Sequence, residues 1–396
     1  MEPVSKKVKL GSGTSDDKQI DPEEDEKQES LPVVLNYDEL RTVFKFMKAI
    51  DVLRAAQVCK SWKVAAYDEV ESRQYPEYIV EQFQSVGSSR RKQICNKQKV
   101  KKVHLLAIDL SIKPHLGFIF MRTNVHKKKG VTTWDPNLYF FNGLPSSCTP
   151  LMISSAYDIV ANHEDTNEKN TVVATFLPKI PNLSVDRHNI SFTEGHINIK
   201  KEKALLKKFF EDSVWNCNQQ SKCVILLTTG EACELSKYAT EYFQSMYKPG
   251  TVALWGGVAA NLTNCSSKQY AACSNVVPPC LTPIVCGVLC ISSPSLQSWS
   301  IVLPESCTSK SEMEKRLRAF KENIQLKKYS LALMCACVAR EGNTHTEIRT
   351  FKEVFPGIDL VGFLGDGEYG LDTLNKERDK NLELSYSTVF LILTYE

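Results

Sequence analysis

The sequence lacks the features that mark secreted and membrane-spanning proteins. Its N-terminus, Met1-Glu2-Pro3-Val4-Ser5-Lys6, has no apolar stretch of the kind found in a signal peptide. The apolar runs, such as the one around Ile284 to Ile291, are far shorter than the ~18 residues that a membrane-spanning helix needs. The net charge is only +3, which does not favour nucleic acid or a membrane surface as a partner. We therefore expect a cytoplasmic and nuclear chain that binds neither.

Motifs for metal binding and catalysis are also missing. The 14 cysteines include no Cys-x-x-Cys pair, and the seven histidines show no His-Glu-x-x-His or other ligand spacing. The sequence has no Gly-x-Ser-x-Gly turn and no Gly-Lys-Ser/Thr phosphate loop. Without a secretory signal, we expect the cysteines to be reduced thiols. We predict no metal, no cofactor and no catalytic residue in this chain.

The first 30 residues differ in composition from the rest of the chain. They show no apolar periodicity and contain an acidic block between Asp16 and Glu26. Such a segment cannot bury enough apolar surface to offset its ordering entropy, which predicts disorder. Before this block, Lys6, Lys7 and Lys9 form a Lys-Lys-Val-Lys motif that resembles a nuclear import signal. A basic tail that only aids solubility is the alternative.

From residue 31 the pattern predicts a small helical unit. Apolar residues recur at three- and four-residue steps from Leu40 to Met47, which indicates one face of a helix. Asp51 is placed to cap a second helix, whose apolar stripe continues to Trp62. Because two such helices cannot form a stable core alone, we expect a partner or the rest of the chain to complete the unit.

This helical unit resembles an F-box. The resemblance rests on the apolar first helix, the Asp51-Val52-Leu53 helix start and the closing Val58-Cys59-Lys60-x-Trp62 motif, although Leu35-Asn36 lacks the usual proline. It implies that the unit docks on the Skp adaptor of a cullin–RING ligase, whereas the alternative is a helical hairpin that packs on the rest of the chain. The adaptor-binding residues that it implies are Leu35, Leu40, Val43, Phe44, Phe46, Met47, Leu53, Val58 and Trp62.

The rest of the chain alternates between strand and helix patterns. The segment 76–102 is basic without interleaved aromatic residues, which favours a solvated helix or linker over an RNA site. Beyond it, apolar runs and helical periodicity predict mixed α/β structure with helix-covered sheets. The predicted strands are 103–110, 116–121, 223–229, 251–254, 284–291, 299–303, 331–338, 359–364 and 386–395. The predicted helices are 231–247, 346–355, and one that runs to residue 324 from a cap at Ser309 or Ser311.

Three motifs in the second half of the chain resemble the FIST module. They are Leu254-Trp255-Gly256-Gly257, Cys335-Ala336-Cys337-Val338-Ala339-Arg340, and the stretch Phe355 to Gly370 with its Gly-Phe-Leu-Gly-Asp-Gly-Glu core. Together with the F-box, they resemble the F-box only protein 22 family. The resemblance implies an α+β fold with a small N-terminal helical F-box and a large mixed α/β module. The implied divisions are 1–30 (tail), 31–75 (F-box), 76–102 (linker), 103–280 (FIST N-terminal-like) and 281–396 (FIST C-terminal-like).

This resemblance implies a non-catalytic substrate receptor. The F-box would bind the adaptor, and the FIST-like module would deliver a protein substrate for ubiquitination and proteasomal degradation, with proximity as the main catalytic effect. The alternative is a small-ligand sensor, or an enzyme, without a ligase role. Desolvated titratable residues clustered at the glycine turns would favour that alternative. An exposed apolar face at 35–62 would favour the receptor.

A candidate ligand or substrate site lies at the glycine turns. It comprises Gly256, Gly257, Cys337, Arg340, Gly365, Gly367 and Glu368. Because side chains alternate along a strand, Cys335 and Cys337 should face the same way. We favour buried thiols that pack as small apolar side chains. The alternative is a reactive or metal-binding pair, in which the charge of Arg340 would favour the Cys337 thiolate. We interpret Arg340 and Glu368 as a buried pair or as ligand contacts, with an ordinary surface pair as the alternative. Gly-x-Gly-x-x-Gly at 365–370 lacks a βαβ context, so we favour a turn whose amides could hold an anionic group over a dinucleotide site.

Overall fold

The described residues of the computed structural model are 35–82, 110–122, 144–145, 147–162, 171–191, 196–216, 221–265 and 281–396. Within these ranges the chain forms seven α-helices and three mixed sheets, which confirms the α+β class. The acidic tail, the import motif at Lys6, Lys7 and Lys9, and all of the predicted strand 103–110 except its last residue lie outside them. Among the described helices, none is both long and apolar enough to span a membrane.

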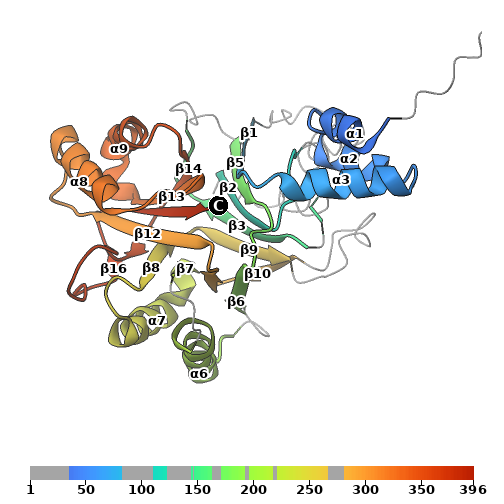
Figure 1. Cartoon of the computed structure of the whole chain (residues 1–396). Coiled ribbons are helices and arrows are strands. Elements are labelled where there is room, and N and C mark those ends of the chain that lie inside the picture. The colour runs from blue at the N-terminus through green and yellow to red at the C-terminus, as the bar shows by residue number, and fades with distance from the viewer. Residues whose placement is uncertain are drawn as a thin grey trace, which may run out of the picture. The chain divides into compact units, whose positions relative to one another are not determined.

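The N-terminal unit contains three helices rather than two. They are α1 (Tyr37–Phe44), α2 (Ala49–Ala55) and α3 (Lys60–Ser72) (Figure 1). The prediction that one helix extends to Trp62 is therefore wrong, because α2 ends and a turn precedes α3. Asp51 is also not a cap: it lies inside α2 and forms an ion pair with Arg54 at 2.9 Å, while Lys48 occupies the N-cap position.

The chain itself completes the core of this unit. Both α1 and α2 pack against α3. The buried guanidinium of Arg73 donates hydrogen bonds to the carbonyl oxygens of Phe44 at 2.5 Å, Met47 at 2.9 Å and Ser111 at 2.5 Å. Its Nε also lies 3.2 Å from a carboxylate oxygen of Glu69. Arg73 therefore joins the end of α1 to the residues that precede the next strand.

After the helical unit, the chain repeats one arrangement of strands three times. Each repeat has an outer strand, two parallel strands, a short strand that leaves the sheet, and a returning antiparallel strand. The first consists of β1 (Glu77–Gln82), β2 (Leu116–Arg122), β3 (Thr149–Ser155), β4 (Ile159–Val160) and β5 (Thr171–Leu177). The second consists of β6 (Ser184–Ile190), β7 (Lys222–Thr228), β8 (Val252–Val258), β9 (Asn261–Cys265) and β11 (Cys286–Ser292), with β10 (Leu281–Ile284) before β11. The third consists of β12 (Leu296–Leu303), β13 (Tyr329–Cys337), β14 (Asp359–Gly365), β15 (Glu368–Gly370) and β17 (Thr388–Tyr395), with β16 (Glu383–Leu384) before β17.

The repeats exchange their short strands in a cycle. Strand β9 of the second repeat pairs with β3 of the first, β15 of the third pairs with β8, and β4 of the first pairs with β14. The resulting sheet orders are β1-β5-β2-β3-β9-β10, β16-β15-β8-β7-β11-β6 and β12-β17-β13-β14-β4. Strands from both sides of residue 280, the predicted module boundary, consequently share sheets.

All three sheets contribute to one central apolar cluster. Its aromatic centre is Phe363, whose ring centroid lies 6.1 Å from those of both Phe120 and Trp255. Helices cover the outer faces of two sheets (Figure 1): α6 (Ile199–Phe209) and α7 (Cys233–Met246) on one, and α8 (Lys310–Asn323) and α9 (Glu341–Val354) on the other. Since these strands are buried on both faces, they form the continuous apolar runs seen in the sequence.

Most predicted strands and helices in the described part of the chain are confirmed, with shifted ends. The segment 76–102, predicted as a solvated helix or linker, instead begins with strand β1, which pairs with β5. Ser309 is the residue that caps α8, in a capping box with Glu312. The predicted strand 284–291 is wrong as a single strand, because it is divided at Val285 between β10 and β11, which belong to different sheets.

Gly256 lies where the parallel strands β7 and β8 approach each other closely. A Cβ atom added to Gly256 would lie 1.6 Å from the carbonyl oxygen of Leu226 on β7. We expect Gly256→Ala to lower the free energy of unfolding by about 3 kcal/mol, because the backbone must move. Gly342→Ala is the matched control, since nothing lies within 4 Å of its added Cβ. Denaturant titration measures both, and equal stability of Gly256→Ala and wild type would contradict this account.

Candidate functional site

The carboxyl ends of the three parallel strand pairs meet at one junction. Backbone hydrogen bonds join the end of each pair to the strand received from another repeat: Ala260 N to Ser154 O (2.9 Å), Asp366 N to Val258 O (3.1 Å) and Leu364 N to Asp158 O (3.0 Å). In parallel sheets, ligands bind outside the carboxyl ends of the strands. The topology therefore makes this junction the expected position for a site.

A layer of nine residues, here called the junction layer, occupies these strand ends. Each sheet contributes three residues that lie side by side across its strands, when the pairing registers are extended by one residue at β9 and by two at β4. These residues are Arg122, Ser155 and Ala260 in the first sheet, Leu227, Gly257 and Glu368 in the second, and Cys337, Gly365 and Tyr157 in the third. Four of the seven predicted site residues belong to this layer. Gly256 and Gly367 adjoin it along the chain, and Arg340 follows Cys337 by three residues. The structure thus brings the predicted residues together.

Glu368 is the carboxylate of the junction layer, and its side chain is fully buried, with 0% exposure. One carboxylate oxygen, Oε2, accepts hydrogen bonds from the backbone N–H of Ser387 at 3.2 Å and from its hydroxyl at 2.7 Å. The other, Oε1, is buried, and no donor in the described ranges reaches it with hydrogen-bonding geometry. Burial raises the pKa of Glu368 to about 7, although Ser387, the Cys337 thiol and Arg340 each lower it.

Both cysteines at the end of β13 are buried, and they lie on one face as predicted. Cys335 faces the central cluster, whereas the alternate residues Met334 and Ala336 face the helices. The favoured interpretation as buried thiols is confirmed, and the alternative of a Cys337 thiolate is wrong. Burial raises the pKa of the Cys337 thiol, and the carboxylate of Glu368 raises it further, while the backbone N–H of Ala339 opposes the rise.

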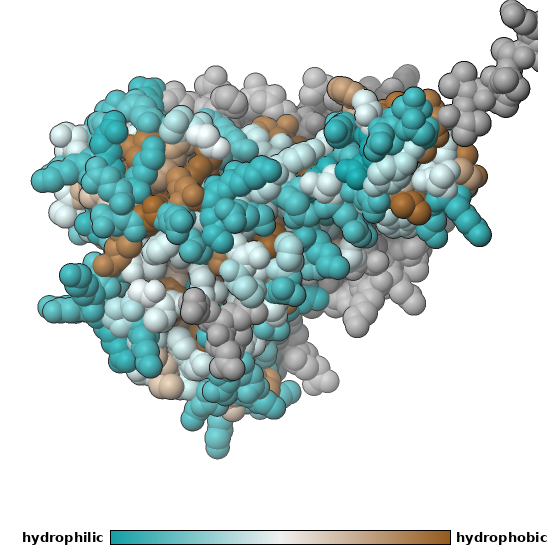
Figure 2. Space-filling view, viewed as in Figure 1, coloured by the Kyte–Doolittle hydropathy of each residue, from teal (hydrophilic) through white to brown (hydrophobic). Residues whose placement is uncertain are grey.

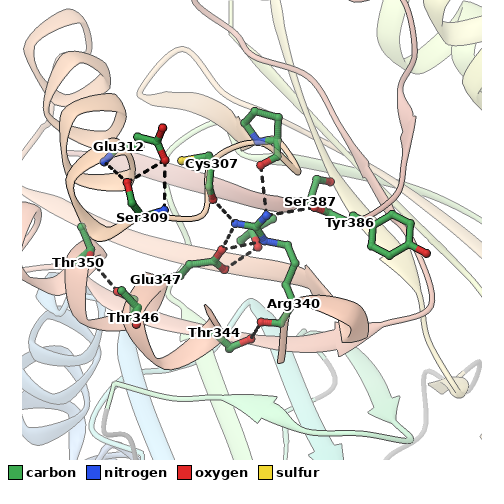
Figure 3. A network of polar contacts seen from close by, with 12 residues as sticks. Cys307, Ser309, Glu312, Arg340, Thr344, Thr346, Glu347, Thr350, Tyr386 and Ser387 are labelled. Carbon is green, nitrogen blue, oxygen red and sulfur yellow. Dashed lines mark hydrogen bonds and ion pairs between the residues drawn. The ribbon is translucent and has the colours of Figure 1, made fainter. Parts of the chain in front are cut away.

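Arg340 is buried and has its own carboxylate partner (Figure 3). Its guanidinium forms an ion pair with Glu347 and donates hydrogen bonds to the carbonyl oxygens of Pro304 at 3.2 Å, Cys307 at 2.8 Å and Tyr386 at 3.1 Å. Glu347 also accepts a hydrogen bond at 2.6 Å from the hydroxyl of Thr388 on β17. Arg340 therefore does not pair directly with Glu368, and neither group forms a surface pair. The hydrogen bonds of Arg340 and Glu347 instead fix the position of the start of β17.

Several residues of this site were not predicted. Tyr157, whose hydroxyl donates to Asp366, follows β3, a strand that the periodicity did not indicate. Ser387 precedes β17, and Glu347 lies seven residues after Arg340, two helical turns away. Ser387, at the start of the predicted strand 386–395, could have been identified as a polar residue at a strand end, whereas no signal marked Tyr157 because β3 was not predicted. Glu368 starts the strand β15 rather than a helix, so a dinucleotide-binding turn does not form here.

The predicted adaptor-binding residues divide into three groups by their exposure to solvent. Leu40 and Phe44 are 0% and 1% exposed, so they form the core of the helical unit rather than a docking surface. Phe46, Val58 and Val43 are 88%, 65% and 46% exposed. The remaining residues, which are half-buried, are Leu35, Met47, Leu53 and Trp62. Figure 2 shows apolar patches among polar atoms over the region that α1–α3 occupy in Figure 1.

Two comparisons relate parts of the chain to known proteins. Residues 34–69 match the F-box domain family. F-box only protein 22 from Homo sapiens is 25% identical over 191 residues, which cover 43% of this chain and 44% of that protein. F-box only protein 22 from Pongo abelii is 24% identical with the same coverage. The match thus spans less than half the length of these relatives.

A solved structure, cyanuric acid hydrolase from A. caulinodans, is similar over 81% of this chain and 99% of its own. The TM-score of 0.34 and the sequence identity of 7% are too low to indicate that the two proteins share a fold or an activity. Within the described ranges, no group of three or more His, Cys, Asp or Glu side chains is placed to hold a metal ion.

The burial of Glu368 predicts a pH-dependent stability. Its pKa rises from 4.5 to about 7 on folding, so the folded protein binds more protons between these pH values. The associated stability is present below pH 4.5 and is lost as the pH rises through about 7. We expect a loss on the order of 3 kcal/mol from this group between pH 4.5 and 8.

Glu368→Gln should remove that dependence and be more stable than wild type at pH 8, because an amide needs no desolvated charge. Denaturant titrations at several pH values measure the difference between the two proteins. Glu377→Gln, at an exposed position, is the control for the loss of one charge. A Glu368→Gln curve parallel to that of wild type would refute the raised pKa.

Proposed function

Because the chain contains an F-box and is a diverged relative of F-box only protein 22, we propose that it is the substrate-recognition subunit of a Skp–cullin–F-box ubiquitin ligase. The observation that supports this most directly is the match of residues 34–69 to the F-box family on a folded three-helix unit. That unit leaves Phe46 88% exposed to solvent. Burying a phenylalanine stabilises a complex by roughly 1.5–3 kcal/mol, so a docked partner would gain from covering it.

In this role the chain contributes binding rather than bond chemistry. The F-box unit binds the Skp adaptor and through it the cullin–RING scaffold. The FIST-like module binds a protein substrate, which the scaffold holds near a charged ubiquitin-conjugating enzyme for ubiquitination and degradation by the proteasome. We place this activity in the cytoplasm and, through Lys6, Lys7 and Lys9, in the nucleus.

Adaptor binding tests the proposal. We expect Phe46→Asp and Val58→Asp each to weaken binding of purified Skp adaptor by roughly tenfold or more, because docking would bury an unpaired charge. Both positions are exposed, so the free chain should still fold. Phe44→Asp is unsuitable, since Phe44 is 1% exposed and its replacement would disrupt the core.

Leu205→Asp on α6 is the matched control, because Leu205 is an aliphatic residue 38% exposed on the α/β module. Biolayer interferometry measures affinity, and circular dichroism checks the fold of each variant. If folded wild-type chain fails to bind the adaptor, or if the F-box variants bind as well as Leu205→Asp, the receptor role is refuted.

A second function is favoured by the junction layer: the chain also serves as a sensor of a small ligand. Its support is the desolvated group Glu368, which has an unpartnered oxygen at the converging carboxyl ends of parallel strands. Ligand binding and adaptor binding use different residues, so one chain can do both. The variants that test one function leave the residues of the other intact.

A further inference from the structure

Glu368 Oε1 is an acceptor whose partner is missing from the described part of the chain. The side chain is 0% exposed, and its other oxygen already accepts two hydrogen bonds from Ser387. The Cys337 thiol is near enough to interact with the carboxylate and lowers the pKa of Glu368, but a thiol is only a weak donor. Leaving a buried polar atom unpaired costs roughly 1–3 kcal/mol, and more if the atom is charged. A buried acceptor in this state points to a donor from outside the described residues, either water or a ligand.

Neither of two nearby arginines forms a direct ion pair with this carboxylate. Arg340 is committed to Glu347 and three backbone carbonyl oxygens, so its guanidinium cannot turn toward Glu368 without breaking them. Arg122 lies beside Asp158, where its charge lowers the pKa of a carboxyl that burial raises. Arg340 stabilises the charge of Glu368 only from a distance, so within the described ranges no direct ion pair balances this carboxylate when it is ionised.

The rim of the junction layer adds further negative charge. Asp366 is exposed and accepts a hydrogen bond from Tyr157, a neutral donor that leaves its charge in place. Asp158 and the exposed Glu341 lie close enough to act on each other, with Arg122 and His345 as the basic groups that act on Asp158. At neutral pH the carboxylates therefore outnumber the cations among these residues.

We propose that the junction layer binds a hydrogen-bond-donating cation, either an ammonium or a guanidinium group, with Glu368 Oε1 as the buried acceptor and Asp366 at the rim. A donor of this kind completes the hydrogen bonding of Glu368 and balances its charge at the same time. Small organic amines and the side chains of lysine and arginine both carry such a group. This inference rests on the second function proposed above and does not depend on adaptor binding.

The test uses the full chain and simple probes. Wild-type protein is titrated at pH 8 with butylammonium, methylguanidinium and neutral butanol at matched ionic strength, and thermal unfolding and calorimetry are recorded. Both cations should raise the melting temperature, whereas butanol should not. Affinity should fall between pH 8 and pH 6, because protonation of Glu368 competes with the cation. Amidated Gly-Lys-Gly and Gly-Arg-Gly binding more tightly than the small cations would identify a protein side chain as the natural source.

Matched variants separate a specific site from general charge effects. Glu368→Gln keeps the shape of the side chain and should weaken cation binding by roughly tenfold or more. Glu383→Gln removes the same charge from the exposed neighbouring strand β16 and should bind as wild type does. If the cations leave wild type unchanged, or shift Glu368→Gln equally, then water alone satisfies Oε1 and the proposal is overturned. Adaptor capture by the same samples shows separately whether the receptor function holds.

Discussion

The central apolar cluster shared by three sheets is the constraint on which the α/β module depends. Each parallel pair must bury one face against this cluster, and two of the three sheets bury the other face against helices. The exchanged strands β4, β9 and β15 then pair with the open edges of the parallel pairs. These requirements bring six strand ends to one place. The junction layer is therefore a consequence of how the apolar surface is buried.

Two buried glutamates near this junction illustrate different uses of charge. Glu347 is matched by Arg340 and Thr388, and the arginine in turn satisfies three carbonyl oxygens, so the group is fully compensated. Removing one partner from such a network leaves an unpaired buried charge, which makes the network a structural requirement. Glu368 has only Ser387 as a strong donor and keeps one oxygen free of partners in the described ranges. The incomplete environment of Glu368 distinguishes a candidate binding group from a structural one.

The helical unit separates core from surface in a similar way. Arg73, Glu69 and the apolar residues Leu40 and Phe44 are enclosed within the chain, so the unit has its own core before any partner binds. Its exposed side chains, Phe46 above all, are consequently available for an adaptor without loss of that core. Several exposed apolar side chains on one small unit with a completed core, here Val43, Phe46, Val58 and Val64, favour an interaction surface more than a single one would.

Local patterns in the sequence determined much of this protein. Apolar runs and helical periodicity predicted β7, α7, β8, β13, β14 and β17, and Ser309 with Glu312 marked the start of α8. The glycine motifs at 256–257 and 365–367 mark strand ends that the structure brings together. Only the tertiary structure decided the exchange of strands, the pairing of Tyr157 with Asp366 across 209 positions, and the exposure of Phe46 rather than Phe44. It also decided that the pKa values of Glu368 and Cys337 are raised. Desolvation and hydrogen-bond partners depend on contacts between distant segments, whereas the periodicity of a sequence reports only on neighbours along the chain.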